Sequence, residues 1–336
     1  MAFRSSSPPP TAPADRYTIV DTPTTRKIPT ITPTKPTRPN AEPAPEPEFQ
    51  VNWSMYDALA PYRYAYWIHP NAITRIRSIN SNYMKTEMAN YNGQAVIIRS
   101  MQSPKDQKAS KQLIAETLSL TRVSHPNIVG FIGFNITADV GLQCICEIVQ
   151  GKTLRDVLNN PSRASKLTWA NEKIGIAIRV ASALSCMHSL RPALIHCNIK
   201  ASKVLLSDGL VPKLSGFGVS RDRTLNEDMT LGIEWCAPEL LLSGEIYDEK
   251  IDVYSFGVLL TELDTCKLPF ANETLKKNEL RIKLVTDTLK LKYSSDCPQV
   301  IVNIVKRCLQ HDPSLRPKSW KLLELLDEAK KEFRQA

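Results

Sequence analysis

The stretch IHCNIKASKVLL, residues 195–206, gathers several side chains that could take part in chemistry. His196 offers an imidazole for proton transfer, and Lys200 and Lys203 offer ammonium groups that attract anions. Asn198 lies between them, and its amide cannot usefully accept a proton. Three interpretations follow from these residues alone: a chance run in a core, a working site with unusual groups, or a site that has lost its chemistry.

The composition is that of an ordinary globular protein. Of the 336 residues, 42% are hydrophobic, and no run approaches the ~18 consecutive apolar residues of a membrane span. The first residues lack the apolar core of a secretory signal, and the eight cysteines show no repeated pairing, so we expect reduced thiols, no metal site and a cytoplasmic location. The net charge of +9 lies on runs typical of solvated helix faces, such as residues 275–284, so we expect no nucleic-acid partner.

The N-terminal part divides into two segments that differ in composition. Residues 1–50 hold twelve of the 24 prolines and no glycine, which predicts a disordered tail. Within it, PTKPTRP (33–39) resembles ligands of proline-recognition modules, although a solvated tail explains it as well. Residues 51–70 contain two tryptophans and four tyrosines, which predicts an aromatic segment that docks either on its own domain or on a protein partner.

The elements that would position residues 195–206 follow from periodicity. Alternating patterns predict strands at 72–79, 83–89, 94–101, 128–134 and 142–149. Spacings of three and four predict helices at 105–123, 173–190 and 300–309. A strand-rich part of about 80 residues followed by a helix-rich part of about 180 indicates two lobes with a cleft between them.

Six segments occur in the order of one family's landmarks. They are HPNIVGFIGF (125–134), ALIHCNIKASKVLL (193–206), KLSGFGVSR (213–221), WCAPELL (235–241), DVYSFGVLLTEL (252–263) and DPSLRP (312–317). With them, residues 71–332 resemble a eukaryotic protein kinase domain and are most similar to the tyrosine-kinase-like serine/threonine kinases. The resemblance implies an α+β, two-lobed fold with a small β-rich N-lobe (71–148) and a large helical C-lobe (149–332).

The resemblance also shows where the catalytic groups of the family are replaced. Phosphoryl transfer needs a phosphate cradle, a phosphate-binding lysine, metal ligands and a carboxylate near the substrate hydroxyl. This sequence has no glycine before Gly93, and Ile79, Ser81 and Met84 stand where the glycines of the cradle would fall. Arg99 replaces the lysine, and a guanidinium is a planar fork rather than a compact charge.

The metal ligands and the catalytic carboxylate are replaced as well. Gly216 stands at the position of the DFG aspartate, and Lys203 at that of the metal-binding asparagine. Neither can bind Mg²⁺, because one has no side chain and the other is a cation. Asn198 occupies the position of the catalytic aspartate. Ile97 replaces the small alanine beside the adenine, which should shrink the pocket.

Two further sets of residues follow from the resemblance. A residual nucleotide pocket would contain Arg99, Glu116, Cys146, Glu147, Ile148, Lys200 and Leu205. The scaffold positions that match the family are Leu120, Phe131, His196, Phe217, Asp252, Glu239 and Arg316. The packing residues are kept while the catalytic ones are replaced, so we expect Arg99 to pair with Glu116 as part of the scaffold.

These residues favour a catalytically inactive kinase-like domain, a pseudokinase, that acts in signal transduction as a scaffold or allosteric regulator. Its partners would be proteins, such as an active kinase or a proline-recognition module. The alternative is an active, atypical serine/threonine kinase with relocated groups, in which Lys85 would replace the phosphate-binding lysine. We expect no cofactor, or else weak ATP binding without metal, with Lys203 in place of Mg²⁺.

Overall fold

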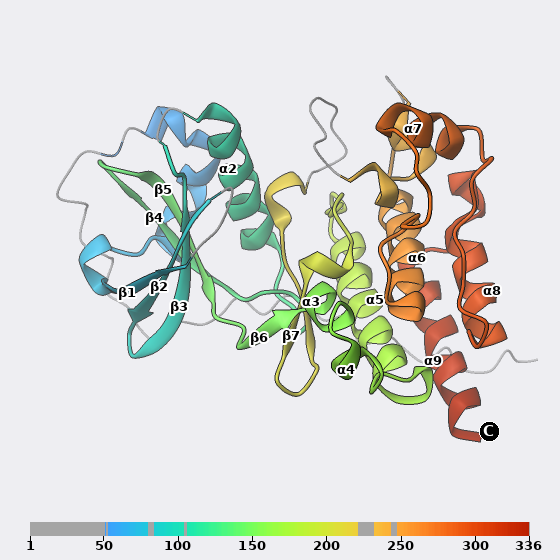
Figure 1. Cartoon of the computed structure of the whole chain (residues 1–336). Helices are drawn as coiled ribbons and strands as arrows, with labels where there is room; N and C mark the ends of the chain where they lie inside the picture. The colour runs from blue at the N-terminus through green and yellow to red at the C-terminus, as the bar shows by residue number, and fades with distance from the viewer. Residues whose placement is uncertain are drawn as a thin grey trace, which may run out of the picture. The chain divides into compact units, whose positions relative to one another are not determined.

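A computed structural model describes residues 51, 53–79, 84–103, 106–220, 232–242 and 247–335 (Figure 1). Its first sheet has five antiparallel strands in the order β1-β2-β3-β5-β4. The strands are β1 (Ile73–Ile79), β2 (Lys85–Tyr91), β3 (Gln94–Ser100), β4 (Phe131–Thr137) and β5 (Gly141–Glu147). Strand β3 shows why this sequence forms a sheet: Val96 and Ile98 alternate with Ile97 and Arg99, so one face is fully buried.

Helix α2 (Gln107–Arg122) lies against this sheet and contacts β4 and β5. It begins at Asp106, whose side chain accepts a hydrogen bond from the backbone N–H of Ala109 at 2.9 Å. Leu113, Glu116 and Leu120 follow at spacings of three and four and are all buried. The helix therefore directs one carboxylate, Glu116, into the interior.

Short helical turns precede the sheet in the chain. They are η1 (Trp53–Met55), η2 (Asp57–Tyr62), α1 (Arg63–Tyr66) and η3 (Pro70–Ala72). The backbone N–H of Ile68 donates to the carbonyl of Phe134 at 2.9 Å, so this segment joins the free edge of β4.

The second lobe is mainly helical and surrounds α6 (Lys250–Thr265), in which every residue from Lys250 to Asp264 is buried. The other helices are α3 (Leu154–Leu158), α4 (Pro161–Ala164), α5 (Ile174–Ser189), α7 (Lys277–Val285), α8 (Gln299–Cys308) and α9 (Ser319–Gln335). The shorter turns are η4 (Trp169–Lys173, π-helical), η5 (Ala201–Lys203), η6 (Phe217–Val219), η7 (Ile233–Trp235), η8 (Pro238–Leu241) and η9 (Pro313–Leu315). A second, three-stranded sheet has the order β6-β7-β8. Its strands are β6 (Gly151–Thr153), β7 (Val204–Ser207) and β8 (Pro212–Leu214).

The predicted α+β fold with a β-rich and a helical lobe is confirmed. The fourth strand was predicted at 128–134 but begins only at Phe131, because Ile128 forms a bridge with Leu214 of β8 and Val129 donates to the same residue at 2.9 Å. Residues 128–129 therefore connect the two lobes instead of extending β4.

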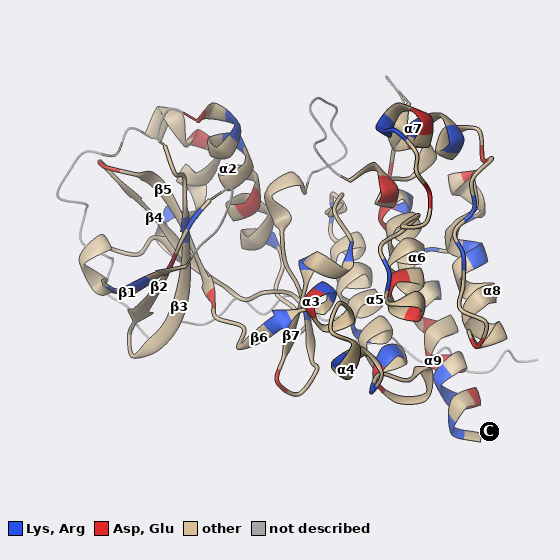
Figure 2. Cartoon of the chain, in the orientation of Figure 1, with Lys and Arg blue, Asp and Glu red and all other residues tan. Residues whose placement is uncertain are grey.

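Charge is interspersed over the helical lobe, with Lys/Arg and Asp/Glu alternating along α7 and α9 (Figure 2). Within the described part of the chain, no helix is long and apolar enough to cross a bilayer. The tail 1–50, with its proline-rich stretch 33–39, and Ser81 of the expected phosphate cradle lie outside the described residues.

Candidate active-site cleft

The stretch 195–206 follows α5 and runs into β7, and Asp252 of α6 binds its first residues. The Asp252 carboxylate is fully buried and accepts the backbone N–H groups of His196 at 2.7 Å and Cys197 at 2.9 Å. It also lies 3.0 Å from Nε2 of His188 on α5. A buried carboxylate with three partners fixes the start of the loop on the central helix.

His196 is a structural residue in this loop. Its Nδ1 accepts the backbone N–H of Asn198 at 3.2 Å, so Nε2 carries the proton and donates to the carbonyl of Ser215 at 3.1 Å. The ring packs edge-on against Phe217, with centroids 4.8 Å apart. Complete burial lowers the pKa of His196 to about 4, so the imidazole is neutral and both of its nitrogens are occupied.

The side chain of Lys203 lies directly beside the backbone of Gly216. Gly216 has φ +88°, and a Cβ added there would lie 2.7 Å from Cδ and 3.2 Å from Cε of Lys203. The backbone N–H and the hydroxyl of Ser215 both donate to the Lys203 carbonyl, at 2.8 and 3.0 Å. The alkyl stem of Lys203 therefore fills the volume beside the bare backbone of Gly216.

The charges of Arg99, Lys200 and Glu116 all act on Lys203. Arg99 of β3 forms an ion pair with the buried carboxylate of Glu116 on α2, and this carboxylate raises the pKa of Arg99. Burial lowers the pKa of Lys203, the charges of Lys200 and Arg99 lower it further, and Glu116 opposes them. In the part of the chain that the structure describes, no carboxylate forms an ion pair with Lys203. The cleft thus holds an excess of positive charge.

Lys200 takes a different position, because its ammonium lies 5.0 Å above the ring of Trp235. Burial lowers the pKa of Lys200, and the charges of Cys236, Glu262 and Glu234 oppose this shift. The indole Nε1 of Trp235 donates to Glu262 at 2.8 Å, and the same carboxylate accepts the backbone N–H of Ala201 at 3.0 Å and pairs with Arg155 at 3.2 Å.

This group around Glu262 was missed by sequence reasoning. Burial raises the pKa of Glu262, which is held by three donors from three elements. The sequence feature that could have indicated it is the acid Glu262 within the mainly apolar stretch 258–263. An acid at a buried helix position needs partners that donate hydrogen bonds to it.

The remaining nucleotide-pocket residues lie along the connection between the lobes. Cys146 of β5 pairs with Ile97 of β3 across the sheet, and its Sγ lies 3.8 Å from the Sγ of Cys144. The hydrogen bond with the Cys144 thiol and burial both raise the pKa of Cys146. Glu147 pairs with Lys213 at 2.6 Å and accepts the backbone N–H of Gly130 at 2.7 Å, and Ile148 follows it directly.

Leu205 of β7 lines an open cavity of about 580 Å³ beside the N-terminus of α3. The other residues of this cavity come from β6, α3, the turn after α3 and the first residue of α4: Gly151, Lys152, Thr153, Asp156, Asn159, Asn160 and Pro161. Neither Arg99 nor Lys203 belongs to it. Met84, at one expected glycine position, is buried in the main core cluster.

Lys85, the residue suggested as a replacement for the phosphate-binding lysine, does not share a face of the sheet with Arg99. Lys85 pairs directly with Ser100 across the β2–β3 ladder, so its side chain shares the face of Ser100 and not that of Arg99. It forms an ion pair with Glu87 at 3.3 Å. The suggestion that Lys85 replaces the phosphate-binding lysine is therefore wrong. Asp208, an acid that follows β7, lies in the β7–β8 turn at the opposite end of the hairpin from Gly216, so it cannot replace the missing carboxylate there.

The scaffold residues lie either in the main core cluster or in a buried ion pair. Leu120 and Phe217 are fully buried in the main core cluster, and Phe131 packs against it. Arg316 binds Glu239 with both terminal nitrogens, at 2.6 and 2.8 Å, and its guanidinium is inaccessible to solvent.

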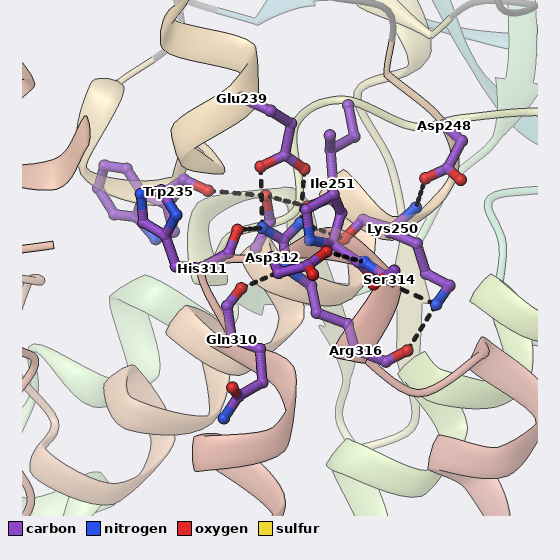
Figure 3. A network of polar contacts seen from close by, with 12 residues as sticks. Trp235, Glu239, Asp248, Lys250, Ile251, Gln310, His311, Asp312, Ser314 and Arg316 are labelled. Atoms are coloured by element: carbon purple, nitrogen blue, oxygen red, sulfur yellow. Dashed lines mark hydrogen bonds and ion pairs between the residues drawn. The ribbon is translucent and has the colours of Figure 1, made fainter. Parts of the chain in front are cut away.

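Figure 3 shows this pair with the carbonyls that complete it. The Arg316 guanidinium also donates to the carbonyls of Gln310, His311 and Lys250, at 2.8, 3.1 and 3.2 Å. All its donors thus stay inside the lobe, and the pair supports the segment that follows residue 232.

Comparisons with known proteins identify the same region. The family description of protein tyrosine and serine/threonine kinases matches residues 78–326. The chain is 31% identical over 243 residues to a probable serine/threonine-protein kinase of Dictyostelium discoideum, which covers 71% of this chain and 26% of that protein. It is 31% identical over 254 residues to a dual specificity protein kinase of the same organism, with 72% of this chain and 17% of that protein covered. A probable serine/threonine-protein kinase of Arabidopsis thaliana is 28% identical over 246 residues, with 67% of this chain and 64% of that protein covered. The chain thus spans about a quarter or less of the two Dictyostelium proteins.

Proposed function

The chain belongs to the protein tyrosine and serine/threonine kinase family, and from that premise we propose that it is a member that regulates other proteins without transferring phosphate. The observation that carries this proposal is the stem of Lys203 packed beside Gly216, where the family resemblance places two metal-binding groups. A buried cation at a cation's site opposes Mg²⁺ by charge, and its stem opposes it by volume.

Two further features support the proposal. Asn198 cannot accept the proton of a substrate hydroxyl, and a positioned general base contributes about 10²–10⁴ in rate. Lys200 is engaged with the ring of Trp235, so it serves the packing of the segment after residue 232. Together these contacts make the loop 195–206 a structural connection between α6, β7 and η7.

Any nucleotide that enters this cleft would do so without a metal. The unpaired charge of Lys203, beside the Arg99–Glu116 pair, would take the role that Mg²⁺ has in neutralising phosphates. The affinity would be weak, because no glycine precedes Gly93 in the sequence to form a phosphate cradle, and Ile97 is larger than the alanine of the family.

The proposed cellular role is that of a cytoplasmic scaffold or allosteric regulator of the tyrosine-kinase-like group. Its partners would be proteins, namely an active kinase or a proline-recognition module that binds residues 33–39. The intact packing of the scaffold residues supports this role, since a folded surface is what a binding function requires.

Phosphotransfer to serine or threonine is the second candidate, and the family comparisons favour it. The relatives are named as protein kinases, and the Arg99–Glu116 pair keeps α2 attached to β3 as an active domain would need. In this case Arg99 would contact the phosphates in place of lysine.

Incubation with radiolabelled ATP and either Mg²⁺ or Mn²⁺ separates the two candidates. We expect no transfer to generic substrates or to the chain itself. Transfer that disappears in a folded Arg99→Ala variant would establish the kinase and refute our proposal.

A thermal-shift titration with ATP tests the metal question. We expect any stabilisation to persist in chelator and to be lost in Lys203→Met, which keeps the alkyl stem but removes the charge. Stabilisation that requires Mg²⁺ would contradict the proposed role of Lys203.

A further inference from the structure

Residues 53–68, the central part of the aromatic segment 51–70, fill a groove of their own domain. Helix α2 forms one side of this groove, and β4 and β5 form the other. Leu59 is fully buried, and Tyr56 and Trp67 are nearly so, in the same core cluster as Leu113 and Leu120 of α2. Turn η2 contacts α2 directly, and Figure 1 shows the segment in blue beside that helix.

The seat is built from aromatic contacts and one backbone hydrogen bond. The Trp67 ring packs edge-on against Phe134 at 5.9 Å and tilted against Trp53 at 5.7 Å. Tyr66 packs on Phe131, one of the scaffold residues, at 5.1 Å. Aromatic pairs of this kind stabilise the packed state beyond the area that they bury. The segment therefore contacts the scaffold as well as the sheet edge.

Two glycines of the sheet make room for the segment. A Cβ on Gly133 would overlap the carbonyl of Tyr66 and would lie 2.7 Å from Cδ1 of Ile68. A Cβ on Gly141 would lie 2.9 Å from the hydroxyl of Tyr56. The groove thus matches the backbone of this segment at two separate places, which is specific complementarity rather than general apolar cover.

The seat also has a weak point. The indole Nε1 of Trp67 is buried and has no hydrogen-bond partner among the residues described. Outside, Met55 and Tyr64 are 65% and 83% exposed, and Arg63 stacks on Tyr64 at 4.6 Å. An unsatisfied buried donor lowers the stability of the seated state, which favours release of the segment.

Helix α2 connects this seat to the cleft. It carries Glu116, which pairs with Arg99, and it also contacts η6, which directly follows Gly216. A Cβ on Gly218 would lie 3.4 Å from the carbonyl of Gln112, so helix and turn are in close contact.

We propose that residues 53–68 are an intramolecular ligand of the groove between α2 and β4–β5, and that their occupancy sets the position of α2. While the segment is seated, α2 keeps the Arg99–Glu116 pair and the contact with η6 without phosphorylation or nucleotide. A partner protein that binds the exposed Met55–Tyr64 side, or that offers its own aromatic segment to the groove, would release α2. This inference does not depend on whether the domain transfers phosphate.

Hydrogen–deuterium exchange on the full chain tests the proposal with a matched pair of glycine substitutions. Gly133→Ala places a methyl group where Tyr66 and Ile68 lie, whereas Gly175→Ala on α5 meets nothing within 4 Å. We expect Gly133→Ala to accelerate exchange at the Ile68 amide and along 107–122 by at least about tenfold, while 250–265 stays protected. Gly175→Ala should leave both regions unchanged.

A second variant, Leu59→Ala, weakens the seat without disturbing β4 and should show the same pattern. Release of Ile68 with unchanged protection of 107–122 would overturn the proposal, because the segment would then not hold α2. A segment that stays seated in both variants would also overturn it. Loss of protection in 250–265 as well would show that the segment is part of the global folding unit, which equally refutes a separable ligand.

Discussion

The contact between Lys203 and Gly216 can be measured by a double-mutant cycle with alanine at both positions. Gly216→Ala introduces two costs: a Cβ at φ +88°, about 1–2 kcal/mol, and overlap with the stem of Lys203 at 2.7 Å, about 1–3 kcal/mol. We expect a total loss of about 2–5 kcal/mol in the free energy of unfolding, measured by urea denaturation followed by far-UV circular dichroism.

In the Lys203→Ala background only the backbone cost remains, because the stem is gone. Gly216→Ala should then cost about 1–2 kcal/mol, which gives a coupling energy of about 1–3 kcal/mol between the two sites. Gly93→Ala is the matched control, since it has φ +79° and nothing lies within 4 Å of the added Cβ. It should reproduce the backbone cost alone.

An equal cost of Gly216→Ala in both backgrounds would refute the reasoning, because the Lys203 stem would then not occupy the space beside Gly216. The same cycle explains why the two departures from the family belong together. Restoring an aspartate at Gly216 alone would meet the Lys203 stem, so we expect Lys203→Asn to relieve part of the loss in Gly216→Asp.

Three further predictions concern the scaffold. The folded pKa of His196, about 4, lies below the unfolded value of 6.5, so the unfolded chain binds more protons in that window and stability falls as the pH drops from 6.5 to 4. This contributes roughly 3 kcal/mol to the pH dependence of urea unfolding, and His196→Phe should flatten the profile there; an unchanged slope would contradict a buried, neutral imidazole. Arg316→Ala leaves Glu239 without its bidentate partner and should lower the free energy of unfolding by about 3–5 kcal/mol. The control is Lys321→Ala, which removes an exposed pair with Glu324 and should lower it by less than about 1 kcal/mol. Trp235→Phe keeps a ring beneath Lys200 but removes the donor to Glu262, so we expect a loss of about 1–3 kcal/mol in urea unfolding; no loss would show that this hydrogen bond is not formed.

The order of the six segments was sufficient to predict the fold. Each segment combines residues with a fixed role in packing, such as Asp252 beneath the loop or Arg316 with Glu239, and roles of this kind depend on residue type. Helix α2 and the strands β1–β3 also followed from periodicity, because apolar spacing reports directly on which face is buried.

The sequence alone determined which groups of a phosphotransfer site are replaced, because a missing carboxylate or glycine is visible without coordinates. Only the tertiary structure decided where the replacements lie. It placed the Lys203 stem beside Gly216, turned Lys85 to the far face of the sheet, and joined Trp235 to Glu262. It also placed the aromatic segment in the groove between α2 and the sheet. Composition alone had not decided between docking on its own domain and docking on a partner protein. The physical reason is that side-chain direction and long-range contacts depend on strand register and on packing between distant segments, and neither is encoded in local spacing.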